Sequence, residues 1–371
     1  MALIIILEIF SLLFLVLFLS VILLYRKKLV WVFLSGVLFS GTTIILVYII
    51  FVVFSTYGIG VKSENRRIVK IERGSSLSEI GKVLFKDGII DSQKEFVWIS
   101  KLFGYEKKLK TGKYEIPGET SYYYLLRLLY SGESIQEKIT IPEGSRTEKI
   151  ASILQEKIGI DEENFISLLN DQSFIRSFGL ETPSLDGFLL PETYNLYWGM
   201  NEQEIITIFI KEFKKILTDS VIANISESEF TLRDNVILAS IIEGEAVHDE
   251  ERSIISAVFH NRLRLNIRLQ ADPTIQYIIS DGPRRLLNED LEIDSPYNTY
   301  RYGGLPPGPI CNPGRKSILA AIYPANEDYL YFVARGDGYH TFSRNTKEHF
   351  LAKRKLDELR RQLKREQKLN E

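Results

Sequence analysis

The chain has 371 residues with 46 basic and 48 acidic side chains, a formal net charge of −2. A nucleic-acid-binding protein usually carries a basic excess, so this balance argues against that class. The length suggests about two or three domains. The single cysteine, Cys311, excludes a disulfide within the chain.

Two long apolar segments open the chain. Residues 1–25 are almost wholly apolar, residues 29–54 contain no charged side chain, and a basic Arg-Lys-Lys turn at 26–28 separates them. Each is long enough to cross a bilayer, which takes about 20 residues as a helix. We therefore predict two transmembrane helices within residues 1–56, with the basic turn inside and both ends facing outward. A cleaved signal peptide or a buried hydrophobic hairpin are the alternatives.

An internal repeat follows a linker at residues 57–65. Six residues of the first copy recur in the second at a constant offset: Ile71, Gly74, Ser75, Ile80, Leu84 and Ile90 match Ile141, Gly144, Ser145, Ile150, Leu154 and Ile160. Each copy predicts a strand, a Gly-Ser turn and a helix capped by Ser75 or Ser145. Such units resemble LysM-type modules, which often bind glycan, but a packing unit without a ligand would show the same pattern. Residues 66–160 are predicted to be a LysM-like region.

Between the two copies we predict a strand over residues 110–116 and a helix over 121–131. Three consecutive tyrosines, Tyr122, Tyr123 and Tyr124, begin that helix. Aromatic faces of this kind can stack on sugar rings. A core position is the more common use of such residues, and we favour it here.

The remainder predicts an α+β catalytic domain over residues 161–352 and a charged C-terminal helix over 353–371. The pattern gives helices at 201–217, 232–242, 250–265 and 317–322, long loops at 268–313, and a hairpin of strands 329–334 and 339–342. Loops this long inside a domain are usually functional. The fold class is therefore α+β, preceded by the apolar segments and the small strand-helix modules.

Several chemistries are excluded by their missing motifs. No paired-histidine zinc motif is present, and the single Glu-x-x-His spacing, Glu245 to His248, lacks the second copy that di-iron bundles need. No nucleophile elbow, phosphate-binding loop or dinucleotide fingerprint occurs outside the apolar segments. We expect no metal and no cofactor. Carboxylates remain, and these suit glycosidic bonds, because the leaving oxygen must be protonated.

Glu243 is the candidate acid. The helical segment before it is apolar almost all round, so its carboxyl should be partly desolvated. Desolvation would raise the pKa and keep the group protonated near neutral pH, as a general acid requires. Gly244 follows directly and weakens the helix, which would open space beside the acid. The alternative is a structural glutamate paired with Arg252 or Arg262.

An ordered set of motifs resembles the endolytic murein transglycosylases, the YceG-like or MltG family. The set spans roughly residues 66–352 and comprises Leu185-Asp-Gly-Phe-Leu-Leu-Pro-Glu-Thr-Tyr, Ala239-Ser-Ile-Ile-Glu243, Phe259-His-Asn-Arg-Leu, Arg268-Leu-Gln-Ala-Asp-Pro-Thr, Tyr297-Asn-Thr-Tyr, Gly304-Leu-Pro-Pro-Gly-Pro-Ile, Asn312-Pro-Gly and Leu330-Tyr-Phe-Val-Ala. Each motif is weak alone, but the ordered set is specific. The family's layout of membrane anchor, LysM-like region and catalytic domain also matches.

The resemblance implies a peptidoglycan lytic transglycosylase, a lyase of the bacterial cytoplasmic membrane whose catalytic domain faces outward. The family's catalytic glutamate falls on Glu243. It protonates the MurNAc–GlcNAc glycosidic oxygen and then acts as base while the sugar's own 6-hydroxyl attacks, leaving a 1,6-anhydro-MurNAc end. One carboxyl serves both steps because the nucleophile is intramolecular. Glycan strands are then the substrate and cell-wall synthases the expected neighbours.

The site differs from many relatives in one place. They carry Glu-Lys-Glu-Thr where this chain has Glu243-Gly-Glu245-Ala246, so the second acid is kept and its neighbours are not. Residues predicted to contact substrate are this second acid and four polar loop residues, namely Glu245, Gln270, Asp272, Asn298 and Tyr300. The alternative for the loop residues is turn architecture.

Two other functions remain open. A non-catalytic glycan-binding envelope protein would use the repeats alone and would not need Glu243. A muramidase that hydrolyses with water usually places a second carboxylate about 5 to 9 Å from the first. Glu245 and Asp272 are the candidates for that role.

Overall fold

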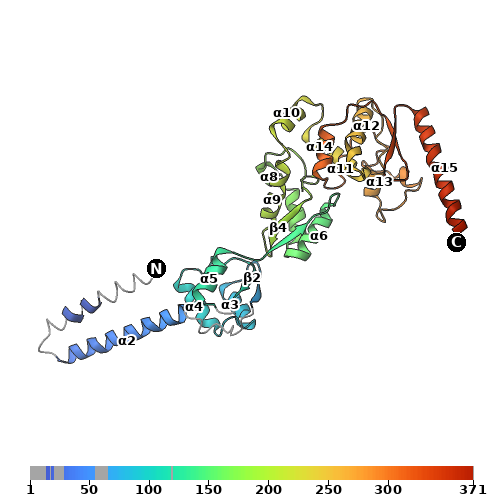
Figure 1. Ribbon diagram of the computed structural model, residues 1–371. Helices are drawn as coiled ribbons and strands as arrows, with labels where there is room; N and C mark the ends of the chain where they lie inside the picture. The colour runs from blue at the N-terminus through green and yellow to red at the C-terminus, as the bar shows by residue number, and fades with distance from the viewer. Residues whose placement is uncertain (1–13, 17, 21–28, 55–65, 118–119, 371) are drawn as a thin grey trace. The chain divides into compact units, whose positions relative to one another are not determined.

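The computed structural model describes residues 14–16, 18–20, 29–54, 66–117 and 120–370 (Figure 1). The chain divides into two compact units. The first comprises the residues up to Ile135 together with Tyr197–Gly199, and the second comprises Gln136–Leu196 and Met200–Glu371. The second copy of the internal repeat therefore belongs to the second unit.

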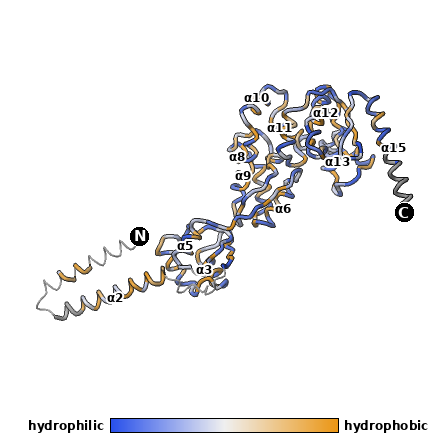
Figure 2. The backbone as a smooth tube through the Cα atoms, viewed as in Figure 1, coloured by the Kyte–Doolittle hydropathy of each residue, from blue (hydrophilic) through white to orange (hydrophobic). Residues whose placement is uncertain are grey.

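A long apolar helix, α2 (Leu29–Phe54), leads into the first unit. Its segment Leu34–Phe54 is long and apolar enough to cross a membrane, and Figure 2 shows it as predominantly hydrophobic. This agrees with a membrane anchor. Most of the first predicted span, residues 1–25, lies outside the described residues.

The first unit packs three helices around a two-stranded sheet. Its elements after α2 are β1 (Arg67–Ile71), α3 (Leu77–Lys86), α4 (Gln93–Leu102), β2 (Gly112–Ile116) and α5 (Tyr122–Ser131). The strands pair antiparallel, from Arg67 opposite Ile116 to Ile71 opposite Gly112. Alternating side chains of both strands point into the core, which includes Val69, Tyr114 and Tyr122. The likeness to LysM modules stays a prediction.

The strand-turn-helix pattern of the repeat is confirmed in both copies, but its capping residues were predicted wrongly. In the first copy Ser76, not Ser75, accepts the hydrogen bond from the Glu79 N–H and forms a reciprocal capping box with that glutamate. In the second copy the cap position is Arg146, which makes no side-chain cap bond. The Ser145 hydroxyl donates instead to the Pro142 carbonyl.

The second unit is mainly helical. Its elements are β3 (Gln136–Thr140), α6 (Thr147–Ile158), α7 (Glu162–Leu169), α8 (Gln172–Ser177), β4 (Thr193–Tyr197), α9 (Glu202–Lys214), α10 (Asp219–Glu227), α11 (Leu232–Glu245), the 3-10 turn η1 (Asp249–Glu251), α12 (Arg252–Arg264), α13 (Asp272–Ile278), the 3-10 turn η2 (Asp290–Glu292), α14 (Arg315–Ile322), β5 (Tyr331–Ala334), β6 (His340–Ser343) and α15 (Thr346–Asn370). Strand β3 pairs with β4, and β5 pairs with β6. The α+β class is confirmed.

The predicted helices and the C-terminal hairpin are present at closely similar bounds. The main difference is α13, which lies within the stretch 268–313 that was predicted to be loop. Pro273 stands in its first turn, where a proline is tolerated because that N–H has no partner in the helix. The helix is only 7 residues long, too short for a periodic pattern to reveal it.

Candidate active site

Helix α11 is the central helix of the second unit. A capping box between Thr231 and Asp234 fixes its start. Every residue from Asn235 to Ile242 is buried, because α12, α13 and α14 all contact this helix. The prediction of a helix that is buried all round is confirmed. Glu243 is the first residue after this buried run, so its side chain emerges where the core ends.

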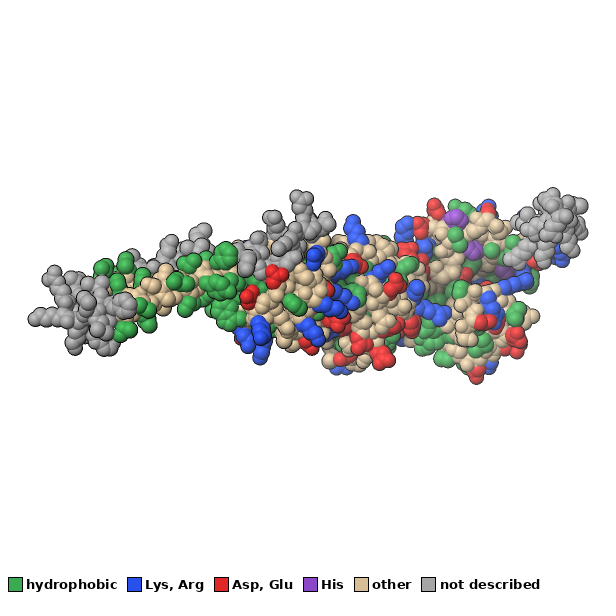
Figure 3. Space-filling view, turned by 90° about the horizontal axis from the view of Figure 1, so that it is seen from below, with side chains coloured by type: hydrophobic (Ala, Val, Ile, Leu, Met, Phe, Trp, Pro, Cys, Tyr) green, Lys and Arg blue, Asp and Glu red, His purple; other side chains and the backbone are tan. Residues whose placement is uncertain are grey.

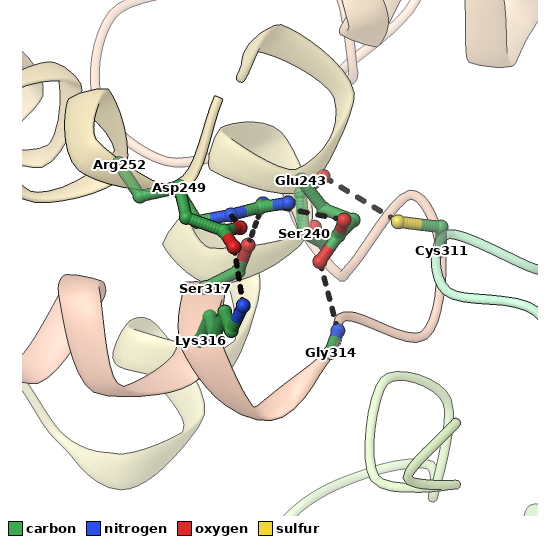
Figure 4. A network of polar contacts seen from close by, with 8 residues as sticks. All are labelled: Ser240, Glu243, Asp249, Arg252, Cys311, Gly314, Lys316 and Ser317. Carbon is green, nitrogen blue, oxygen red and sulfur yellow. Dashed lines mark hydrogen bonds and ion pairs between the residues drawn. The ribbon is translucent and has the colours of Figure 1, made fainter. Parts of the chain in front are cut away.

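The Glu243 side chain is only 7% exposed and has two partners. Its Oε2 accepts a hydrogen bond of 2.8 Å from the Gly314 N–H, at the start of α14. Its Oε1 lies 3.3 Å from Nη1 of Arg252 (Figure 4). The burial prediction is confirmed, and the alternative ion pair with Arg252 is also present. Both partners are hydrogen-bond donors that orient the carboxyl, and its protonation near neutral pH stays a prediction.

Arg252 is itself held in place by several groups. Its Nε donates to Asp249 at 3.0 Å, and its Nη1 also donates to the Ser317 hydroxyl. Asp249 pairs in turn with Lys316. Because Arg252 has these other partners, its 3.3 Å contact with Glu243 is one of several and can lengthen without leaving the guanidinium unpaired.

Glu243 also lines an open pocket of about 460 Å³. Glu243 is therefore accessible to a molecule that enters this pocket, although it is also ion-paired. The walls come from α11, α13, the loop before α14 and the loop between β3 and α6. The lining residues include Gly144, Arg146, Glu245, Asp272, Tyr277 and Cys311.

The β3–α6 loop brings a part of the site that sequence reasoning missed. Gly144 lies against Glu243: a Cβ added to it would be 3.6 Å from the Glu243 Cγ. Arg146 donates to the Gln276 carbonyl at 2.9 Å and lies 4.8 Å from the centre of the Tyr277 ring. The repeat drew attention to this loop as a helix-capping turn. The sequence feature that could have indicated a place in the site is the pair of charged residues in this loop, Glu143 and Arg146.

Glu143 is a second carboxylate beside Glu243. Its side chain covers Gly314, where a Cβ would meet the Glu143 carboxyl at 2.1 Å, and Gly314 is the residue that donates to Glu243. Burial raises the pKa of Glu143, and the neighbouring Glu243 raises it further. A side chain at position 314 would displace the Glu143 carboxyl from its present position.

Two of the predicted substrate contacts, Glu245 and Asp272, line the pocket, and a third, Tyr300, bonds Asp272. The Tyr300 hydroxyl donates to Asp272, and the Asp272 backbone N–H bonds Glu245. Burial, followed by the charge of Asp272, raises the pKa of Glu245 to about 8. Burial likewise raises the pKa of Tyr300. Glu245 is thus an acid that holds its proton at neutral pH.

The structure does not bring the other two predicted contacts to the pocket wall. Asn298 is fully buried, its amide donates to the Leu291 and Ile293 carbonyls, and its oxygen accepts from the Tyr300 N–H. It therefore holds the loop that presents Tyr300. Gln270 is exposed, has a positive φ of 50°, and bonds Thr299 through its backbone.

The Glu245 pKa predicts a pH-dependent stability. An unfolded glutamate has a pKa of about 4.3, so between about pH 4 and pH 8 the folded chain keeps a proton that the unfolded chain releases. Stability should fall as pH rises through that window. We expect Glu245→Gln to reduce this pH-dependent loss of unfolding free energy by about 1–3 kcal/mol. The value is smaller than the full difference in pKa would give, because the side chain is partly exposed. Urea unfolding at pH 5 and pH 8.5 would measure it, with exposed Glu181→Gln expected to leave the fall unchanged.

Gly244 lines the pocket beside Glu243, and it has in addition a packing role that was not predicted. A Cβ at this position would lie 2.6 Å from the Pro273 Cβ, so Gly244 lets α13 pack closely on α11. Alanine normally favours a helix over glycine by about 1 kcal/mol, but here the clash should dominate. We expect Gly244→Ala to destabilise the chain by about 1–2 kcal/mol in urea unfolding.

Gly303 supplies the control for this substitution, because a Cβ there would meet nothing within 4 Å. Gly303→Ala should change the free energy of unfolding by less than about 0.5 kcal/mol. Equal stability of Gly244→Ala and the wild type would show that α13 adjusts without cost.

Cys311 faces the same pocket but is unsuited to nucleophilic chemistry. Its thiol donates weakly to the Ser240 carbonyl at 3.4 Å. Burial, together with the charge of Glu243, raises the pKa of Cys311 to about 12. The reactive form is the thiolate, which this environment disfavours. The carboxylates are therefore the groups of this site that can move protons.

A helical domain in which a buried glutamate borders a carboxylate-rich open pocket is the arrangement that the sequence motifs predicted. The model of the YceG-like family matches residues 69–355. The chain belongs to this family, and the predicted resemblance is confirmed.

Named relatives agree with this assignment. The endolytic murein transglycosylase of Bacillus subtilis (strain 168) is 33% identical over 303 residues, which cover 77% of this chain and 84% of that protein. The endolytic murein transglycosylase of Streptococcus pneumoniae serotype 2 is 29% identical over 331 residues, which cover 81% of this chain and 60% of that longer protein.

A solved structure is also similar. The crystal structure of a putative yceG-like protein from Listeria monocytogenes superposes with a TM-score of 0.52 and 31% sequence identity. The match covers 77% of this chain and 99% of that one. The names of the relatives agree with the enzyme class predicted from the sequence, a lytic transglycosylase.

Proposed function

We propose that this protein is a lytic transglycosylase that cuts the MurNAc–GlcNAc bond of peptidoglycan strands and leaves 1,6-anhydro-MurNAc ends. The observation that supports this most is the position of Glu243, whose buried carboxyl borders an open pocket in a chain of the YceG-like family. The related enzymes named endolytic murein transglycosylase support peptidoglycan as the substrate.

The contacts of Glu243 suit an acid that becomes a base. The Gly314 N–H and Arg252 hold its carboxyl in one orientation and favour the charged form that exists after the proton has been given to the leaving oxygen. The same carboxylate then accepts the proton of the sugar's 6-hydroxyl as that oxygen attacks the anomeric carbon. No water or second nucleophile enters this sequence.

Glu143 supports the first step, in which Glu243 must carry a proton. Two carboxyl groups in close proximity disfavour a double negative charge, so the pair retains a proton to a higher pH than either group alone. Glu143 is in this position, because it covers the glycine that donates to Glu243. We assign it as a positioning residue for the proton on Glu243.

We expect Glu143→Gln to lower the cleavage rate at pH 7 by about 10-fold. Loss of its charge makes protonation of Glu243 harder, so the basic limb of the pH–rate profile should move to lower pH. The rate at pH 5 should fall less than the rate at pH 7. Exposed Glu156→Gln on α6 serves as the control, and a pH–rate profile identical to that of the wild type would contradict the role.

Hydrolysis with water is the competing reaction, since Glu245 and Asp272 line the same pocket as Glu243. The test is mass spectrometry of purified peptidoglycan strands after digestion by the purified full chain. Anhydro ends support the proposal, and reducing MurNAc ends would replace it with a muramidase. No cleavage at all would favour a glycan-binding protein without catalytic activity.

The location of the activity is part of the proposal. With α2 as a membrane anchor, we place the catalytic unit on the outer face of the bacterial cytoplasmic membrane, where peptidoglycan lies. Cell-wall synthases that release new strands there are the expected neighbours. Protease treatment of intact spheroplasts, which reaches only outward-facing segments, would test this orientation.

A further inference from the structure

Five aromatic rings form a continuous band across the first unit, starting at the end of α2. The rings are those of Phe54, Tyr123, Phe103, Tyr105 and Tyr130. Their successive centroid distances are 5.2 Å, 6.0 Å, 6.2 Å and 4.9 Å. We call this set the aromatic band. It joins α2, α5 and the loop after α4.

Three rings of the aromatic band are exposed, whereas Phe103 and Tyr105 are partly buried against the core of the first unit. Phe54 is 40% exposed, Tyr123 36% and Tyr130 43%, and the neighbouring Tyr124 is 47% exposed. Tyr122, from the same run of tyrosines, is by contrast fully buried, so the predicted core position is confirmed for Tyr122 and wrong for Tyr123 and Tyr124. The unit therefore places one tyrosine inside and keeps the band at its surface, which leaves an apolar face without a protein partner in the described residues.

The position of the band is fixed by its contact with α2. Val52 and Val53, in the last turn of α2, are 6% and 1% exposed and belong to the core of the first unit. Most of the preceding helix is exposed, including Val47, Tyr48 and Phe51. Figure 3 shows hydrophobic side chains along α2 up to the point where it meets the unit. The unit thus begins within the last turn of the helix that is apolar enough to cross a membrane.

If α2 crosses a membrane, the start of the aromatic band lies near the lipid headgroups. A helix rises about 1.5 Å per residue, so a side chain that touches Phe54 lies within a few ångströms of the point where the apolar helix ends. Tyrosine and tryptophan are enriched at this level, where one part of the ring meets lipid and the hydroxyl meets water. The band has that composition.

Charge favours the same surface. The segment that carries Phe103 and Tyr105 also carries four exposed lysines, Lys101, Lys107, Lys108 and Lys110, against one acidic residue, Glu106. Lysines next to an apolar anchor attract anionic lipid headgroups.

We propose that the first unit docks on the lipid surface of the membrane that α2 crosses, with the aromatic band at the level of the headgroups and the lysine-rich loop toward their phosphates. The occupant of this face is the bilayer itself. The inference rests on α2 being inserted in the membrane and is independent of the catalytic chemistry.

Tryptophan quenching in nanodiscs tests this docking on the full chain. The three native tryptophans, Trp31, Trp98 and Trp198, are first replaced by phenylalanine. One tryptophan is then introduced at Tyr123 or at Tyr130, and the control is Tyr323→Trp in the second unit, where the native residue is 42% exposed. Lipids brominated near the headgroup quench fluorophores at that depth.

We expect Tyr123→Trp and Tyr130→Trp to show at least about three times the fractional quenching of Tyr323→Trp. Circular dichroism and thermal unfolding identify any variant that fails to fold. Two positions in the band are used, so the test still gives a result if one of the two variants does not fold. Quenching at the folded band positions no greater than at the control would overturn the proposal. A blue-shifted band tryptophan without lipid quenching would also overturn it, because protein would then cover the band.

Discussion

Glu243→Gln should lower peptidoglycan cleavage by about 10²- to 10⁴-fold, the range for loss of a general acid-base group. The amide has the same shape as the acid, so it can still accept the Gly314 N–H hydrogen bond. It can neither donate a carboxylic proton nor take one from the 6-hydroxyl. The measurement is release of soluble muropeptide fragments from purified peptidoglycan, alongside thermal unfolding of the same preparation.

Folding should survive this substitution because Arg252 keeps its other partners. Asp249 and Ser317 remain bonded to the guanidinium when Glu243 loses its charge. The control is Glu250→Gln, on the exposed turn that follows α11 and outside the pocket, which should retain full activity. Wild-type cleavage by folded Glu243→Gln protein would remove Glu243 from the mechanism.

Asn312→Ala should lower the free energy of unfolding by about 2–5 kcal/mol, because buried polar groups lose their partners. Asn312 is 1% exposed. Its side-chain oxygen accepts from the N–H groups of Gly187 and Leu189, and its amide donates to the Ser145 carbonyl. The substitution leaves two buried backbone donors unsatisfied. Urea unfolding followed by circular dichroism would measure the loss.

The matched control is Asn288→Ala, an exposed loop position. It should change the free energy of unfolding by less than about 0.5 kcal/mol. The loss of activity in Asn312→Ala should exceed that expected from unfolding alone, because the β3–α6 loop that carries Gly144 and Arg146 is held by the same amide. A change in stability equal to that of the control would show that water satisfies the freed groups.

The candidate active site could be predicted in part because its signal is local. An apolar run that ends at Glu243 indicates a buried helix with an acid at its end, and the structure has both. The ion pair with Arg252 could be predicted only as an alternative, since it depends on how η1 turns the chain back toward α11. Residue type alone gave no distinction between Tyr300, which lies beside Asp272, and Asn298, which is buried within its own loop.

Glu143 could not be predicted because the pocket combines segments 100 residues apart in sequence: Glu143 and Glu243 become neighbours only when β3 pairs with β4 and the following loop reaches α14. Gly244 shows the same limit. A glycine within a helix can mark a weak point of the helix or a close contact with a neighbouring helix. Only the position of Pro273 in the structure shows that Gly244 serves a close contact.

The division of the chain at Gln136 sets a practical limit on dissecting this enzyme. A truncation that begins at Asp161, where the repeat ends in sequence, would delete the strand that pairs with β4 and one wall of the pocket together with Glu143. A soluble fragment intended for crystallisation or for recombination with a relative therefore has to start before Gln136. Any ancestral duplication that produced the two repeat copies has left one of them as a wall of the pocket that Glu243 lines.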